Sequence, residues 1–301
     1  MSPIHSTPFT IPKGSTILVT GVNGFIGSHV ANEFLQRGYQ VRETARDTFK
    51  AGWIKDLFHQ QYGKDNFSLW PVADLTSSHA FDKVIKGVAA VVHVASPLGL
   101  DSGTKTMIPD AIASALNALK AANSESSVKR FVYTSSSTAA VFPEAGVPDL
   151  SDLVVNTVLP STNFGKSLDW KHQGYPSTSG FIRTLWSGTA LESLTNASPQ
   201  YFVDVQDDAK LHIAATLLHD VQGERIFPWA ETWNLDQILA ILRAQNPDRT
   251  FVKDFQAMRY LADIEEPRSR CIQLLQALGE PGFTSLEESI RLNSEDLARA
   301  A

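Results

Sequence analysis

Short apolar runs alternate with amphipathic stretches through the first half of the chain. The apolar runs predict strands at STILVT (15–20), YQVRETAR (39–46), SLWPVADL (68–75), VAAVVHVAS (88–96) and RFVYTSS (130–136). The segments SHVANEFLQRG (28–38) and PDAIASALNALKAANS (109–124) carry the spacing of helices. The run 88–96 is continuously apolar and β-branched, which is typical of a parallel strand buried on both sides. We therefore predict an α/β fold, a doubly wound parallel sheet with helices on both faces, whose ligands bind at the carboxyl ends of the strands.

The pattern changes after Pro160, where loops rich in Gly, Ser, Asn and Trp follow. Beyond them the sequence predicts strands at QYFVDV (200–205) and ERIFPWA (224–230) and helices at NLDQILAILRAQ (234–245) and RSRCIQLLQALG (268–279). We expect residues 1–165 to form the main sheet domain. We expect residues 166–301 to form a smaller C-terminal substrate lobe that is interleaved with the last strands of the sheet.

An unusual segment joins two predicted strands, RFVYTSS and LVVNTVLP (153–160). Between them stands only STAAVFPEAGVPDLSD (137–152), which has no helical period and contains two prolines. Neighbouring parallel strands are normally joined through a helix. Such a helix covers on the order of 400 Å² of apolar sheet, so at about 25 cal/mol/Å² roughly 10 kcal/mol of burial is forgone without it. We predict that one crossover helix is missing, and we expect another surface to cover the sheet there, for example by self-association.

Charge and cysteine content exclude several classes of function. The net charge of -6 gives no general attraction to nucleic acid or to anionic membrane surfaces, and no apolar run approaches the ~20 residues that span a bilayer. We expect no nucleic-acid partner, no membrane partner and a cytoplasmic location. Cys271 is the only cysteine and lies among leucines at helical spacing, so we expect a buried structural thiol. The eight histidines form no H-x-x-x-H pair, so no metal site is expected.

A glycine-rich turn follows the first predicted strand. Gly21, Gly24 and Gly27 form G-x-x-G-x-x-G between that strand and a helix, which is the context in which backbone amides bind a dinucleotide pyrophosphate. The second strand ends in TARDTFK, so Arg46 and Lys50 stand where a 2′-phosphate would lie. This favours NADP as the cofactor and identifies residues 1–165 as a Rossmann-type NADP-binding domain. Asp47, beside Arg46, keeps NAD as an alternative.

Several strings along the chain, VTGVNGFIGSHV, HVASPL, FVYTSSSTAAV, VVNTVLPSTNFG, GYPSTSGFIR, YFVDVQD and GFTSLEESI, resemble the extended short-chain dehydrogenase/reductases. The closest resemblance is to the fungal carbonyl and aldehyde reductases of the dihydroflavonol reductase-like group. It implies an NADP-dependent oxidoreductase that reduces an aldehyde or ketone of a small or medium organic molecule, in secondary metabolism for instance. By position it implies cofactor contacts at Gly21, Gly24, Phe25, Ile26, Gly27, Arg46, Lys50, Asp74, Leu75, Ala95, Ser96 and Pro160.

The resemblance also implies a catalytic Ser, Tyr and Lys, of which only the Ser is found. Reductases of this type protonate the carbonyl oxygen with a Tyr, whose pKa is lowered by a Lys four residues later, and orient the carbonyl with a Ser hydroxyl. Ser136 matches the Ser. Four residues after the six tyrosines stand Glu43, Asn66, Ser137, Ser179, Val205 and Ile264, so no Tyr-x-x-x-Lys exists. Judged against the family pattern, a block of about forty residues is absent between the two strands that flank 137–152.

Three hypotheses follow from the missing helix. In the first, the protein as its natural source makes it contains the segment that this sequence lacks, and it is an ordinary NADPH-dependent carbonyl reductase. Alternatively, the shortened chain catalyses a cyclisation, isomerisation or dehydration, or a weak reduction with another acid, for which Lys166, Lys171, His172 and Tyr175 are candidates. The third hypothesis is a catalytically inactive NADP-binding protein.

Overall fold

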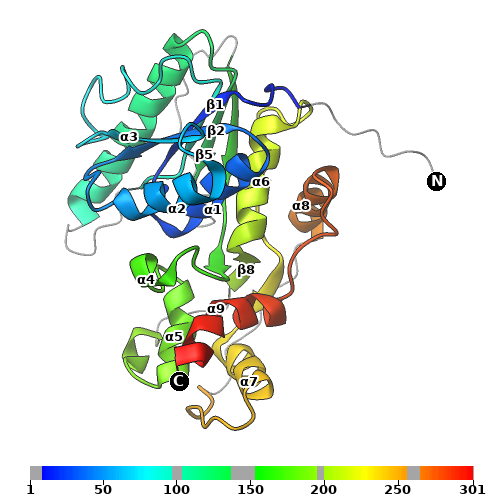
Figure 1. Cartoon of the computed structure of the whole chain (residues 1–301). Coiled ribbons are helices and arrows are strands. Elements are labelled where there is room, and N and C mark those ends of the chain that lie inside the picture. Colours follow the sequence, from blue (N-terminus) through cyan, green and yellow to red (C-terminus); the bar gives the residue numbers. More distant parts are fainter. Residues whose placement is uncertain (1–8, 97–103, 137–152, 195–199, 256–264, 301) are drawn as a thin grey trace.

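A seven-stranded parallel sheet forms the centre of the larger lobe (Figure 1). The computed structural model of the chain describes residues 9–96, 104–136, 153–194, 200–255 and 265–300. The strands lie side by side in the order β3 (Phe67–Pro71), β2 (Gln40–Ala45), β1 (Thr16–Thr20), β4 (Ala90–His93), β5 (Arg130–Thr134), β6 (Val154–Val158) and β9 (Arg225–Ile226). Every neighbouring pair is parallel. This strand order is that of a Rossmann-type sheet extended by one short strand, which confirms the predicted fold class.

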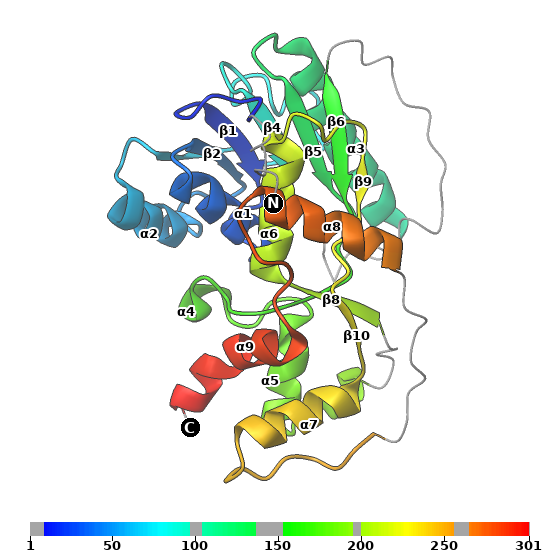
Figure 2. The ribbon, with the colours of Figure 1, turned by 90° about the vertical axis from the view of Figure 1, so that its right-hand side faces the viewer.

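Helices cover both faces of this sheet. One face carries α1 (Phe25–Gln36), α2 (Gly52–Tyr62), α6 (Val205–Leu217) and α8 (Glu265–Ala277), whose apolar side chains form one buried cluster with the strands. The opposite face carries α3 (Thr104–Ser124), and Figure 2 shows it on the far side of the strands from α6 and α8. This helix begins five residues before the predicted start at Pro109. Proline removes one backbone donor, and here that loss does not end the helix.

The smaller lobe lies beneath the large sheet in Figure 1 and has its own three-stranded sheet. Its strand order is β10 (Glu231–Trp233), β8 (Gln200–Asp204) and β7 (Thr162–Phe164). Around it lie α4 (Trp170–Gln173), α5 (Ser179–Ser187), a 3-10 helix (Leu191–Leu194), α7 (Leu235–Gln245) and α9 (Leu286–Ala300). Because α6, α8 and β9 return to the large sheet, the two lobes are interleaved along the chain.

Apolar side chains on the α3 face of the large sheet are partly exposed on β6 and on α3 itself. Val155 on β6 is only partly buried against the apolar cluster of that face. On α3, Ile108, Ile112 and Leu116 follow one another at four-residue spacing and are exposed by 62%, 54% and 36%. The segment 137–152, in which the sequence predicts no crossover helix, lies outside the described residues.

Cys271 is fully buried on α8, and its Sγ lies 3.1 Å from the carbonyl oxygen of Phe227. Burial raises the pKa of this thiol to about 12. The predicted burial of this thiol is thereby confirmed, and the raised pKa disfavours the reactive thiolate. Among the described residues, none of the helices is long and apolar enough to cross a membrane.

Candidate functional site

The site residues predicted from the sequence gather at one edge of the large sheet, because the carboxyl ends of parallel strands share an edge. They are Gly21 after β1, Arg46 and Lys50 after β2, Asp74 and Leu75 after β3, Ala95 and Ser96 after β4, Ser136 after β5 and Pro160 after β6. β1 and β4 are neighbours in space although two strands separate them in the chain. Their ends form the switch point at which such sheets bind ligands.

A tight turn joins β1 to α1 at this switch point. Gly21 has a φ of +77°, and a Cβ there would lie 3.0 Å from the backbone of Ala95. A Cβ on Gly27 would overlap the carbonyl oxygen of Gly21 and lie 2.6 Å from its carbonyl carbon. The amide of Gly24 donates a 3.0 Å hydrogen bond to that same oxygen. The turn therefore folds the backbone onto itself at positions where no side chain fits.

The N-terminus of α1 is suited to bind an anionic diphosphate. Gly24 is the N-cap and has no side chain to accept hydrogen bonds from the first-turn amides. Phe25, Ile26 and Gly27 open the helix, so their N–H groups have no acceptor within the helix itself. Together with the positive end of the helix dipole, these amides make an anion site. The residues predicted to bind the pyrophosphate therefore lie where backbone amides without a helical acceptor are available.

A polar network beside the turn was not singled out from the sequence. The hydroxyl of Thr20 accepts the amides of Val94 at 3.1 Å and Ala95 at 3.0 Å and lies 3.0 Å from Nδ1 of His93. Nε2 of His93 lies 3.3 Å from the hydroxyl of Ser114 on α3. The network ties the ends of β1 and β4 to α3 and thereby holds Ala95 in place. Thr20 directly precedes Gly21, and His93 lies two residues before Ala95. Their closeness to these predicted cofactor residues was the one signal in the sequence that could have pointed to the network.

We expect one measurable consequence for His93. Burial lowers the pKa of His93 to about 4, below the ordinary value of about 6.5 in an unfolded chain. Its contribution to stability is therefore complete above pH 6.5 and is lost as the pH falls toward 4. Relative to His93→Gln, the free energy of unfolding of the unmodified protein should fall by about 2 kcal/mol between pH 7.5 and pH 5. Urea unfolding of both proteins at both pH values tests this, and a difference independent of pH contradicts it.

The residues predicted to contact the adenosine half of the nucleotide lie beyond β2 and β3. Arg46 and Lys50 are exposed there, as a phosphate contact requires. Asp47 accepts the amides of Phe49 at 3.0 Å and Lys50 at 3.1 Å, so its carboxylate shapes the turn into α2. That local role accounts for an acid beside Arg46 without a ribose contact.

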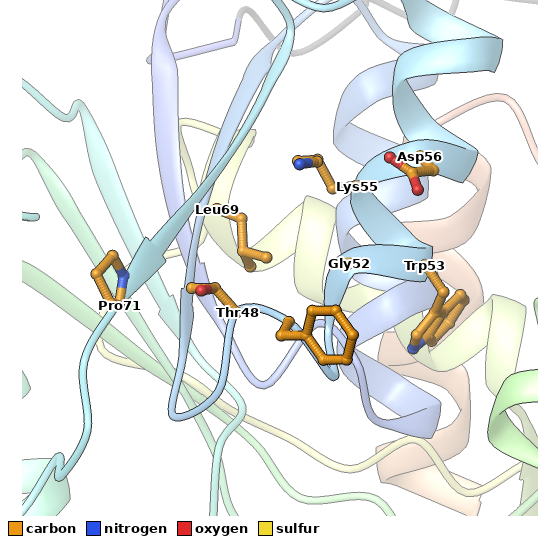
Figure 3. A pocket seen from close by; sticks show the side chains of 8 residues that line it. Thr48, Gly52, Trp53, Lys55, Asp56, Leu69 and Pro71 are labelled. Atoms are coloured by element: carbon orange, nitrogen blue, oxygen red, sulfur yellow. The ribbon is translucent and has the colours of Figure 1, made fainter.

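A hollow of about 600 Å³ opens next to this turn, between α2 and β3 (Figure 3). Its lining residues are Thr48, Phe49, Gly52, Trp53, Lys55, Asp56, Leu69 and Pro71. Beyond β3, the carboxylate of Asp74 accepts hydrogen bonds from the hydroxyl and amide of Thr76 and from the hydroxyl of Ser77, at 2.7 to 2.9 Å. These bonds, those from Thr76 first, lower the pKa of Asp74, so it is ionised at neutral pH.

Two of the alternative acids considered from the sequence, Lys171 and His172, lie on α4. α4 is capped by Asp169, and Gln173 at its end donates to the carbonyl oxygen of Gly24 and to the hydroxyl of Ser28, both at 3.0 Å. The ring of His172 stacks on Trp53 of α2, with centroids 5.1 Å apart. α4 therefore packs against both the glycine turn and the first turn of α2. β1 and β2, which lead into these two segments, stand two and three positions from β5 in the sheet, or roughly 10 and 14 Å, so α4 lies away from the strand end that carries Ser136.

The other two candidates are engaged in contacts of their own. Nζ of Lys166 forms an ion pair with Glu295 at 2.9 Å. Burial raises the pKa of Tyr175, and Arg183 stacks over its ring at 5.8 Å. A tyrosine activated for proton transfer has a lowered pKa, so Tyr175 lacks that sign of activation. In the part of the chain that the structure describes, no group of three His, Cys, Asp or Glu side chains is placed to hold a metal ion.

Comparison with known proteins decides the family. The NAD dependent epimerase/dehydratase family matches residues 17–167, about half of the chain and the part that carries the glycine turn. The chain belongs to this family. Among curated family members, Aldehyde reductase 2 of Sporidiobolus salmonicolor is 31% identical over 93% of this chain and 95% of its own. Ketoreductase adrE of Penicillium roqueforti is 31% identical over 94% of this chain and 96% of its own.

Solved structures agree with the predicted fold. Gre2 from Candida albicans, in complex with NADPH, superposes with a TM-score of 0.77 and 22% identity over 96% of this chain and 99% of its own. Vestitone reductase from alfalfa superposes with a TM-score of 0.73 and 19% identity over 95% of this chain and 99% of its own. Likeness at this level of identity establishes the fold. Together with the fungal reductases, it confirms the resemblance to the dihydroflavonol reductase-like group.

The alignment with Aldehyde reductase 2 also bears on the length of this chain. It extends over 331 positions, whereas the whole chain has 301 residues. At least 30 positions of that alignment, the difference between these lengths, therefore have no residue in this chain. This relative thus has residues that this chain lacks.

Proposed function

We propose that the chain is an NADP-dependent carbonyl reductase of small or medium organic molecules, in a form that lacks the family's proton donor. The observation that carries this proposal is the glycine turn at the switch point, followed at the end of β2 by the exposed cation Arg46. The relatives named aldehyde reductase and ketoreductase support the reaction class. The NADPH complex of Gre2 supports the choice of nucleotide.

Each part of the proposed site has a separate task. The amides at the mouth of α1 bind the pyrophosphate, and Arg46 with Lys50 binds the 2′-phosphate. Asp74 and Leu75 line the adenine, while Ala95, Ser96 and Pro160 line the path to the reacting end. The bound nicotinamide supplies the hydride. The Ser136 hydroxyl orients the substrate carbonyl by donating a hydrogen bond to its oxygen. Residues 1–165 then form the nucleotide-binding domain and 166–301 the substrate lobe.

The source of the proton separates this proposal from its alternatives. No Tyr-x-x-x-Lys exists in the sequence, and the longer alignment with Aldehyde reductase 2 supports a missing block. Loss of one positioned acid typically lowers a rate by about 10²–10⁴. We therefore expect this chain to be a weak reductase. The lack of a Tyr-x-x-x-Lys also favours a catalytically inactive NADP-binding protein as the second candidate. An intact mass several kilodaltons larger from the natural source would favour a longer, fully active product.

Arg46 provides the direct test of the proposed cofactor. We expect Arg46→Ala to weaken NADPH binding by about tenfold or more, because one charge-assisted phosphate contact is lost, and to leave NADH binding within about twofold. Nucleotide fluorescence titrations of both proteins measure this selectivity. Lys64→Ala, which removes an exposed cation just beyond the C-terminal end of α2, is the matched control. Equal losses for NADPH and NADH, or no loss, would contradict the assignment.

Self-association and a cytoplasmic location remain predictions. Self-association through the α3 face agrees with the exposed stripe of Ile108, Ile112 and Leu116. A cytoplasmic location agrees with the single buried and reduced Cys271.

A further inference from the structure

Glu43 is a buried acid directly beneath the glycine turn. It lies on β2, paired with Val19 of β1 and Leu69 of β3, and its exposed fraction is 0%. A carboxyl group in such a place is costly unless it is hydrogen-bonded. Its neighbours in the sheet are apolar, so the strand itself gives no reason for an acid at this position.

The partner of Glu43 lies in the turn. The amide of Val22 donates to both carboxyl oxygens of Glu43, each at 3.0 Å. Val22 is itself fully buried, so water does not reach this amide, and the turn's own hydrogen bond uses the amide of Gly24 instead. An unpaired buried N–H is strongly unfavourable. Glu43 therefore supplies an acceptor from outside the turn for this buried amide.

We propose that Glu43 is a positioning residue for the cofactor: its carboxyl group holds Val22, and through it the glycine turn, in the shape that presents the α1 amides to the pyrophosphate. This inference rests on the proposed function. Glu43 does not itself touch the nucleotide. It acts on binding by fixing the backbone between β1 and α1, where the close approach of Gly27 to Gly21 leaves no room for an altered turn.

The carboxyl group of Glu43 is compatible with an anionic diphosphate bound at the adjacent turn. Burial raises the pKa of this carboxyl group well above its ordinary value, while the hydrogen bonds from Val22 and Gly21 lower it. The neutral acid is thereby favoured, and its carbonyl oxygen still accepts the Val22 amide. A neutral acceptor under the turn does not repel the diphosphate as a fixed negative charge would.

Three variants of the full chain test the proposal. Glu43→Ala removes the acceptor, Glu43→Gln keeps a neutral acceptor of the same length, and Thr44→Val is the matched control. Thr44 is the next residue of β2, is buried, and has a hydroxyl with no hydrogen-bond partner among the described residues. The measurements are the Kd for NADPH and amide hydrogen exchange at Val22, with Val19 and Val92 as reference amides in the same sheet.

We expect Glu43→Ala to weaken NADPH binding by about tenfold or more and to speed exchange at Val22 selectively. Glu43→Gln and Thr44→Val should bind within about threefold of the unmodified chain. The inference is overturned if Glu43→Ala binds NADPH normally, or if it speeds exchange at Val19 and Val92 as much as at Val22. Failure of the unmodified chain to bind NADPH would instead overturn the proposed function and this inference together.

Discussion

Gly27→Ala is expected to weaken NADPH binding by about 100-fold or more. The added Cβ would overlap the carbonyl oxygen of Gly21 and lie 2.6 Å from its carbonyl carbon, both of which are backbone atoms. A flexible side chain could move away, but here the turn itself must open. Opening it displaces the first-turn amides of α1 that are proposed to bind the pyrophosphate. A fluorescence titration with NADPH measures the effect.

Gly52→Ala is the matched control for this substitution. Gly52 is the first residue of α2, close to the same site, and a Cβ there would meet nothing within 4 Å. This variant should bind NADPH like the unmodified chain and be at least as stable, since alanine favours helix. Normal binding by a folded Gly27→Ala would show that the nucleotide does not depend on this turn.

The second large effect is a gain of activity. Replacing residues 137–152 with the longer segment of a family member that carries the Tyr-x-x-x-Lys helix should raise kcat for NADPH-dependent carbonyl reduction by about 10²–10⁴. The reason is that Ser136 and the predicted cofactor residues already stand at the carboxyl ends of the strands, whereas the sequence contains no Tyr-x-x-x-Lys. Steady-state oxidation of NADPH with aromatic and aliphatic aldehydes measures the gain.

The same insert with its tyrosine changed to phenylalanine is the control for that experiment. It restores the helix and its packing without the acid, so it should improve stability and leave kcat low. If the tyrosine insert folds and binds NADPH but gives no gain in rate, the missing helix does not explain weak reduction. The non-redox and non-catalytic alternatives would then be favoured.

The larger lobe could be predicted from the sequence because its signals are local. The apolar run at 88–96 contains the fully buried β4. The G-x-x-G-x-x-G spacing corresponds to a turn in which a Cβ on Gly27 has no room. Parallel strands then bring their ends to one edge whatever the loops do. This is why the predicted site residues lie together although they are spread from Gly21 to Pro160.

Features that depend on long-range contacts could not be predicted in the same way. Glu43 appears in the sequence as one polar residue of an alternating strand, and its contact with Val22 exists only once β1 and β2 are paired. The placement of His172 against Trp53 depends on how a four-residue helix folds back onto α2. No periodicity or motif predicts the contact between His172 and Trp53, because the packing of the smaller lobe on the larger one determines it.

Equilibrium titration of the unmodified chain with NADPH tests the central claim most directly. The claim is that the turn between β1 and α1, with Arg46 beyond β2, binds an NADP dinucleotide. We predict saturable binding of one NADPH per chain, with a Kd well below about 1 mM and tighter than that for NADH. A folded chain that binds neither nucleotide saturably would contradict the account.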